Sequence, residues 1–188
     1  EILRKGGNAI DAAVAVGYAL AVTEPCCGNL GGGGFMLIRL ANGESVFINF
    51  RETAPLAATA NMYLDRNGEI IPGRSRNGYL AVAVPGTVRG LDLALQKYGT
   101  RSRQQVIAPA IALAGQGFIL GTGDIEILRR SGEKLKDPSM AAIFLKNGSK
   151  PYEVGDRLVQ KNLARTLTQI ARGGPAVFYG GEIGAQVV

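Results

Sequence analysis

The stretch GNLGGGGFMLIRL, residues Gly28–Leu40, decides how this chain of 188 residues begins its sheet, because four consecutive glycines directly precede an apolar run. The continuous apolar character of Phe35–Leu40 predicts a buried strand. Glycine has no Cβ and lets another backbone approach closely. The four glycines therefore predict that other backbone, or a substrate held against backbone, lies within contact distance of the loop.

The glycine loop does not have the context of a phosphate-binding loop. Phosphate loops lie between a strand and a helix, so that amide groups and the helix N-terminus face the anion. Here Asn8 is expected to cap a helix that runs from Ala9 to about Thr23 and ends before Pro25, and a strand follows the loop. No Gly-Lys-Ser/Thr sequence follows the glycines. The pattern disfavours a nucleotide site.

A hairpin is expected next, because Asn42-Gly43 is a strong turn signal. The returning strand lies within residues 44–52, and its period of two puts Ile48 on one face and Arg51 at the end of the strand, pointing away from that face. Residues 53–78 are rich in loop signals. A short strand is predicted from Tyr79 to the Pro85-Gly86 pair.

Helices dominate the rest of the sequence. They are expected from Thr87 to about Tyr98, from the Ser102–Gln105 capping box to about Gly115, and over residues 122–131 and 162–171. Strands early and helices late favour an α/β or α+β arrangement. Residues 1–188 show no internal repeat or dividing linker, which predicts a single domain. Both ends lie within helical patterns, so we expect the chain to be part of a longer polypeptide.

Composition narrows the chemistry. The 21 basic and 15 acidic residues give a net charge of +6, but the charges are scattered, whereas nucleic-acid binding needs a clustered basic face. The chain has no histidine, which removes histidine-dependent triads and imidazole metal sites. The apolar run from Ala9 to Val22 is too short for a membrane span. We expect no metal and no cofactor.

Cys26 and Cys27 are the two cysteines, and they are adjacent. A disulfide between them would be strained, and two thiols alone cannot supply four metal ligands. Two interpretations remain open, namely small buried side chains beside a tight loop, or a reactive thiol.

Arg51 is the candidate binding residue. It follows a strand and precedes a proline-containing loop, where binding residues are often held by a rigid scaffold. Its planar guanidinium suits bidentate capture of a carboxylate. The alternative is an ordinary solvated surface arginine.

Four long motifs occur in order, namely KGGNAIDAAVAVGYALAVTEP, GNLGGGGFMLIRL, FRETAP and PGTVRGLDLALQKYGT. Together they resemble the N-terminal part of the large subunit of γ-glutamyltranspeptidase, and the resemblance covers nearly the whole chain. It implies an N-terminal-nucleophile hydrolase, an α+β fold with a four-layer αββα sandwich, of which this chain is an incomplete portion. It also implies that the glycine loop is structural and brings the first helix and the first strand close together.

The resemblance implies roles for two residues. Arg51 matches the family arginine that binds the α-carboxylate of the γ-glutamyl substrate, and Glu52 matches its neighbour, which would orient the surroundings. The nucleophile would be the N-terminal Thr of a small subunit released by self-cleavage, so no catalytic residue is expected in this chain. The whole enzyme would transfer the γ-glutamyl group of glutathione or a related donor to water or an amino acid. A periplasmic or extracellular location is also implied.

Other functions stay open at this point. Some members of the family are acylases that act on glutaryl-type β-lactam side chains or on poly-γ-glutamate, and several of those donors also present a carboxylate. A non-catalytic module that keeps a carboxylate-binding arginine is the alternative from another class.

Overall fold

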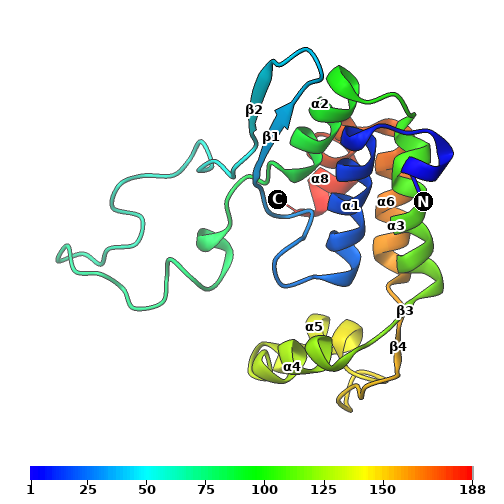
Figure 1. Cartoon of the computed structure of the whole chain (residues 1–188). Coiled ribbons are helices and arrows are strands. Elements are labelled where there is room, and N and C mark those ends of the chain that lie inside the picture. Colours follow the sequence, from blue (N-terminus) through cyan, green and yellow to red (C-terminus); the bar gives the residue numbers. More distant parts are fainter. Residues whose placement is uncertain (188) are drawn as a thin grey trace. The chain divides into compact units, whose positions relative to one another are not determined.

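The computed structural model describes residues 1–187 (Figure 1). The chain divides into two compact units, each with its own internal contacts. One unit comprises Glu1–Asn29 and the chain from Leu91 onward, and the other is Leu30–Gly90. Helix α2 (Thr87–Tyr98) begins at the end of the second stretch and continues into the first.

The larger unit is built on three helices that pack against one another, α1 (Ala9–Thr23), α3 (Arg103–Gln116) and α6 (Lys161–Gly173) (Figure 1). Alanines on the buried faces allow neighbouring helix backbones to approach closely, and branched aliphatic side chains fill the remaining space. The fully buried aliphatic side chains of these helices are Val14, Val22, Val106, Ile107, Leu167 and Ile170.

Shorter elements complete this unit. Strand β3 (Phe118–Ile119) pairs antiparallel with β4 (Arg157–Leu158). The remaining elements are η1 (Leu3–Lys5), α4 (Thr122–Arg130), η3 (Lys134–Lys136), α5 (Pro138–Phe144), α7 (Pro175–Tyr179) and α8 (Glu182–Val187). Among the described helices, none combines the length and apolar character that a bilayer span requires.

The predicted caps of α1 and α3 are confirmed. Asn8 accepts a hydrogen bond from the Asp11 amide at 2.9 Å, and Asp11 accepts one from the Asn8 amide at 2.8 Å. Ser102 and Gln105 form the same reciprocal capping box at the start of α3. Each box satisfies amide donors that the first helical turn would otherwise leave unpaired.

Asp11 also ties α1 to the connection between α2 and α3. Its buried carboxylate accepts hydrogen bonds from the Thr100 amide at 2.8 Å, the Thr100 hydroxyl at 2.7 Å and the Arg101 amide at 3.0 Å. Burial raises the pKa of Asp11, but the hydrogen bonds from Thr100, Asn8 and Arg101 outweigh it, so that the net pKa is lowered. The carboxylate is therefore held charged where α1 and α3 start and α2 ends.

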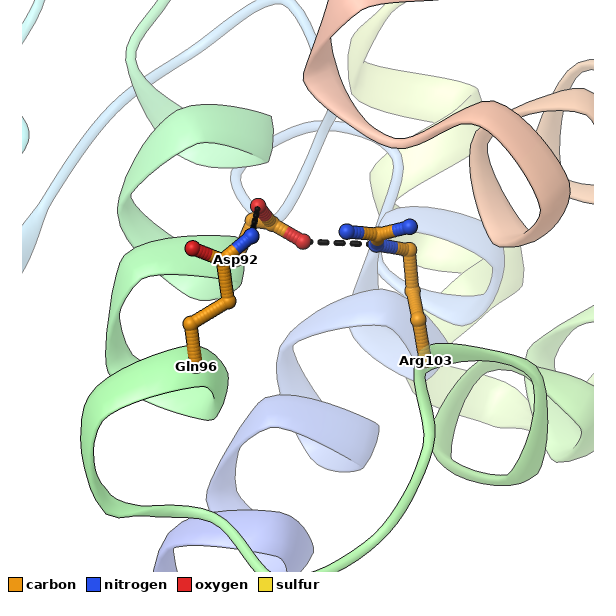
Figure 2. A network of polar contacts seen from close by, with 3 residues as sticks. All are labelled: Asp92, Gln96 and Arg103. Atoms are coloured by element: carbon orange, nitrogen blue, oxygen red, sulfur yellow. Dashed lines mark hydrogen bonds and ion pairs between the residues drawn. The ribbon is translucent and has the colours of Figure 1, made fainter.

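A second polar network joins α2 to α3 (Figure 2). Arg103 Nε donates to Asp92 Oδ1 at 2.6 Å, and Gln96 Nε2 donates to Asp92 Oδ2 at 2.7 Å. The Asp92 side chain is only 6% exposed, and both of its oxygens have a partner. Burial of this carboxylate is thus compensated by a charge and an amide.

The smaller unit contains the predicted hairpin. Strand β1 (Phe35–Arg39) pairs antiparallel with β2 (Ser45–Asn49), with Met36 opposite Ile48 and Leu37 opposite Phe47. Gly43 adopts φ +89° in the turn, as the Asn-Gly signal requires. Because hairpin strands accompany a mainly helical chain, the fold class is α+β, one of the two arrangements expected.

Three expectations about local structure were wrong. Phe35–Leu40 is not wholly buried, because only one face of the hairpin is covered: Ile38 and Ile48 are buried, whereas Leu37 and Phe47 are exposed. Phe35 stacks on Phe47 on the exposed face, with ring centroids 5.6 Å apart. The run is continuously apolar because both faces of the strand carry apolar side chains, and the rest of this chain buries only one of these faces.

The predicted strand after Tyr79 is instead the short 3-10 helix η2 (Tyr79–Ala81), followed by a single bridge between Val84 and Thr53. A strand needs a partner along its length, and here only one residue has one. The cysteines are also not buried: both thiols are exposed, because they lie in the turn that follows α1.

Candidate functional site

The glycine loop lies against the backbone that follows β2, as predicted from its missing side chains. Gly34 and Phe50 exchange two backbone hydrogen bonds, at 2.9 and 3.2 Å. A Cβ on Gly33 would lie 2.5 Å from the Phe50 carbonyl oxygen and 2.9 Å from Arg51 Cα. No side chain can be accommodated at such distances without a shift of backbone. The loop is therefore a structural support for the segment that carries Arg51.

The loop also holds the start of α2. The Gly32 carbonyl accepts hydrogen bonds from the Gly86 amide at 2.8 Å and the Thr87 amide at 3.0 Å. A Cβ on Gly86 would lie only 2.0 Å from the Phe50 carbonyl oxygen. The backbones of the glycine loop, of Phe50 and of Gly86 thus meet at one place. This close contact explains why the two segments that flank Phe50 carry glycines.

Arg51 lies two residues beyond the end of β2 and is fixed through its backbone. Its amide donates to Asn49 Oδ1 at 3.0 Å, and on the other side Thr53 and Val84 exchange hydrogen bonds at 2.8 and 3.1 Å. Its side chain is 58% exposed. The backbone is therefore rigidly placed while the guanidinium remains accessible to a ligand.

Glu52 is the partner of that guanidinium. Glu52 Oε2 lies 3.1 Å from Arg51 Nη1, which is an ion-pair distance. The oxygen is shielded from solvent and accepts no hydrogen bond, so it can still accept one from a ligand. Among residues 1–187, Glu52 is the residue that forms an ion pair with the Arg51 side chain. The other N–H groups of the guanidinium are therefore available to bind a ligand. The pair can hold a carboxylate while Glu52 limits how the guanidinium turns.

A pocket of about 750 Å³ adjoins the two residues. Besides Arg51 and Glu52, its wall combines small and apolar side chains with two hydroxyl groups. Those further wall residues are Gly31, Thr53, Ala54, Pro55, Ala58, Thr59, Met62, Tyr63, Ala81, Val82 and Ala83. A charged group in a wall of mostly small residues fits a short, polar, anionic ligand.

Sequence reasoning found the charged residues of this pocket but missed its wall. Tyr63 donates its hydroxyl hydrogen to the Leu80 carbonyl at 3.0 Å, which joins two parts of the long loop. Such a contact has no periodic signal in the sequence. Thr59, a threonine inside the chain, lines the pocket as a wall residue.

The reactive-thiol interpretation gains no support from the electrostatics. The hydrogen bond with Cys27, followed by that with Glu24, raises the pKa of Cys26 to about 12. A catalytic cysteine needs the opposite shift.

The family model for gamma-glutamyltranspeptidase matches residues 1–188, the whole chain. The chain belongs to the gamma-glutamyltranspeptidase family. It is 56% identical over its full length to the glutathione hydrolase proenzyme of Pseudomonas sp. (strain A14) and 50% identical to that of Escherichia coli (strain K12). It is also 44% identical, over 98% of its length, to the acylase ACY 1 proenzyme of Pseudomonas sp. (strain SE83).

A solved gamma-glutamyltranspeptidase has the same fold in the corresponding region. The crystal structure of the Helicobacter pylori protein matches with a TM-score of 0.95 and 50% identity, covering 99% of this chain and 54% of that one. The chain spans 33% and 32% of the lengths of the two glutathione hydrolase proenzymes. It corresponds to one part of a gamma-glutamyltranspeptidase.

Proposed function

We propose that this chain is the N-terminal part of the large subunit of a γ-glutamyltranspeptidase and that Arg51 binds the α-carboxylate of the γ-glutamyl donor. The observation that carries the proposal is an exposed guanidinium on a backbone fixed from both sides, at the edge of a pocket of about 750 Å³. The family match over residues 1–188 supports the reaction class.

The contribution of Arg51 is positioning. A bidentate ion pair with the donor carboxylate fixes one end of the γ-glutamyl chain, and this places the γ-carbonyl at the nucleophile. Glu52 restricts the guanidinium from one side, so that the fork faces the pocket in a narrow range of orientations. The relatives named as proenzymes support the further proposal that a small subunit, released by self-cleavage, supplies an N-terminal Thr as nucleophile.

An N-terminal Thr needs no histidine, because its own α-amine accepts the hydroxyl proton. The hydroxyl attacks the γ-amide carbonyl, the amine leaves with a proton, and a γ-glutamyl ester forms. Water or an amino acid then takes the acyl group. Glutathione and related γ-glutamyl amides are the proposed donors, and a periplasmic or extracellular location is proposed from the resemblance, to be tested by cell fractionation.

The test uses the full-length protein as wild type, Arg51→Ala and Arg51→Lys, with Arg39→Ala as the matched control. Arg39 is also an arginine of the hairpin unit, but its Nη1 donates to Ser45 Oγ at 2.9 Å and it is not one of the residues that line the pocket. Release of p-nitroaniline from γ-glutamyl-p-nitroanilide gives KM and kcat, and a denaturing gel shows whether each variant splits into two subunits.

Loss of a charge-assisted bidentate contact is expected to raise KM for Arg51→Ala by about 10- to 100-fold. Arg51→Lys should recover part of that loss, and Arg39→Ala should behave as wild type. On 4-aminobutyryl-p-nitroanilide, which lacks the α-carboxylate, wild type and Arg51→Ala should differ little. An unchanged KM in a split Arg51→Ala enzyme would refute the carboxylate role. A wild type that neither splits nor turns over would favour the non-catalytic module.

The acylase relative supports a second candidate function. A glutaryl donor keeps a carboxylate at the same distance from its amide but lacks the amino group, so Arg51 could serve both reactions. The ratio of kcat/KM for γ-glutamyl- and glutaryl-p-nitroanilide separates them: a transpeptidase favours the first, and an acylase favours the second.

A further inference from the structure

The turn that follows α1 brings three metal-ligating side chains together. Glu24, Cys26 and Cys27 each offer one ligand atom, and the three atoms lie within 4.8 Å of one another. Cys26 Sγ already donates a hydrogen bond to Glu24 Oε1 at 3.0 Å. Across residues 1–187 this is the one grouping of three His, Cys, Asp or Glu side chains so close together.

The backbone of this turn is fixed before any ligand arrives. The Glu24 carbonyl accepts hydrogen bonds from the Cys27 amide at 3.1 Å and the Gly28 amide at 2.8 Å. Gly28 lies directly on α1, where an added Cβ would be 2.8 Å from Leu20 Cβ. Because the chain is held on both sides of the cysteines, bringing the ligands together requires only side-chain rotation.

The local field favours a cation. The turn lies at the C-terminal end of α1, where the unpaired carbonyls carry partial negative charge. The last turn of α1 contains no basic residue, and the Glu24 carboxylate adds a full negative charge. Cys26 and Cys27 are exposed, so an ion can reach them from solvent.

We propose that Glu24, Cys26 and Cys27 form a binding site for a thiophilic divalent cation of the zinc type, with the fourth coordination position open to solvent. Zinc takes sulfur at about 2.3 Å and carboxylate oxygen at about 2.0–2.2 Å, which places tetrahedral ligands about 3.5–3.8 Å apart. Separations of up to 4.8 Å therefore need to contract by at most about 1.0–1.3 Å. Thiolate ligands select such ions over magnesium and calcium.

Binding of the cation releases the protons of the two thiols. Each cysteine loses its S–H proton to the buffer as the metal–sulfur bond forms, the Glu24 carboxylate coordinates in its ionised form, and no electron is transferred. Two thiols alone are too few ligands for a stable site. The carboxylate supplied by the turn is what makes a three-ligand site, and the open position would hold a water molecule or an exogenous ligand.

The test uses the full-length protein, purified without a polyhistidine tag, reduced and freed of metal. Zn²⁺ is titrated against a chromophoric chelator for wild type, Cys26→Ser, Cys27→Ser, Glu24→Gln and the control Glu44→Gln, which removes an exposed carboxylate elsewhere. Each change at the site removes one of three ligands and is expected to weaken Zn²⁺ binding about tenfold or more, whereas the control binds as wild type. Equal binding by wild type and both serine variants would overturn the proposal.

Two further measurements do not depend on how the variants fold. Co²⁺ added to wild type should give a thiolate-to-metal charge-transfer band in the near ultraviolet. Saturating Zn²⁺ should slow the alkylation of Cys26 and Cys27 by iodoacetamide, which peptide mass spectrometry assigns to these residues. Alkylation of both at the rate seen without metal would show that the ion is bound elsewhere or not at all.

Discussion

Arg103 Nε donates a 2.6 Å hydrogen bond to Asp92 Oδ1, which joins the start of α3 to the middle of α2. Gln96 completes the carboxylate's coordination from the same helix as Asp92 (Figure 2). The Asp92 side chain is almost fully buried, and these two partners replace the hydration that its oxygens lose. The start of α3 is thus held against α2 by a polar contact that both oxygens of the carboxylate share.

Removal of Asp92 should therefore cost more than removal of an exposed charge. Asp92→Ala leaves the Arg103 guanidinium unpaired and mostly buried, and we expect the free energy of unfolding to fall by about 2–4 kcal/mol. Glu126→Ala is the control, because Glu126 pairs with Arg130 in an exposed i,i+4 contact whose loss is expected to cost about 0.5 kcal/mol or less. Urea unfolding of both variants checks this, and equal losses would contradict the assigned role of Asp92.

The close contact between Gly33 and Phe50 predicts a matched pair of glycine variants. Gly33→Ala would place a methyl group 2.5 Å from the Phe50 carbonyl oxygen. The backbone must shift, and we expect a loss of about 1–3 kcal/mol in stability together with a higher KM, because the shift displaces Arg51.

Gly123→Ala is the control for that variant. Gly123 lies in α4, and an added Cβ would meet nothing within 4 Å. Here alanine should stabilise the protein by about 0.5–1 kcal/mol, because it restricts the unfolded chain and favours helix. A Gly33→Ala protein as stable as Gly123→Ala would mean that the glycine loop can move away from Phe50.

These glycines show what the sequence could predict. The order helix, glycines, strand disfavoured a phosphate loop, and the run of four residues without Cβ predicted close backbone contact, because both conclusions depend on local chemistry. The cap at Asn8 and the capping box at Ser102 were predicted for the same reason. Arg51 was found from its place after a strand and from the resemblance, whereas its role in binding stays a prediction.

Tertiary features were beyond such reasoning. Periodicity tells which residues share a face of the hairpin, but not that Leu37 and Phe47 would be left exposed in this chain. The sequence showed two adjacent thiols, and only the turn after α1 shows that Glu24 joins them. The pocket wall, including Tyr63, comes from a long loop without a repeating pattern.

Asp11 predicts a specific pH dependence of stability. Burial acts to raise its pKa, but its hydrogen bonds outweigh burial and hold the pKa below the ordinary value of 3.8. The folded-state pKa is below the unfolded one, so the contribution of Asp11 is complete above about pH 3.8 and is lost as the pH falls through the lower folded value. Asp11→Asn should be less stable than wild type at about pH 6, and the gap should narrow below about pH 3.8. Urea midpoints across this range test it, and a gap independent of pH would contradict it.

If Glu52 orients Arg51, the effects of substituting the two residues on KM should be coupled, which a purely structural role of Glu52 would not produce. If Glu52 acts by orienting Arg51, which lies 3.1 Å away, Glu52→Gln should raise KM for γ-glutamyl-p-nitroanilide about threefold or more with little change in kcat. The variant should match wild type on 4-aminobutyryl-p-nitroanilide, which has no carboxylate for Arg51 to hold. Glu44→Gln, an exposed carboxylate of the same unit, serves as the control for lost charge.

The Arg51→Ala background decides how Glu52 acts. Once the guanidinium is gone there is nothing for Glu52 to orient, so adding Glu52→Gln should raise KM no further. Full additivity of the two changes would mean that Glu52 contacts the donor itself through its shielded and unused Oε2 acceptor. In that case the loss on Glu52→Gln should persist on the donor that lacks the carboxylate, since the donor's amino group would be the hydrogen-bond donor to Oε2.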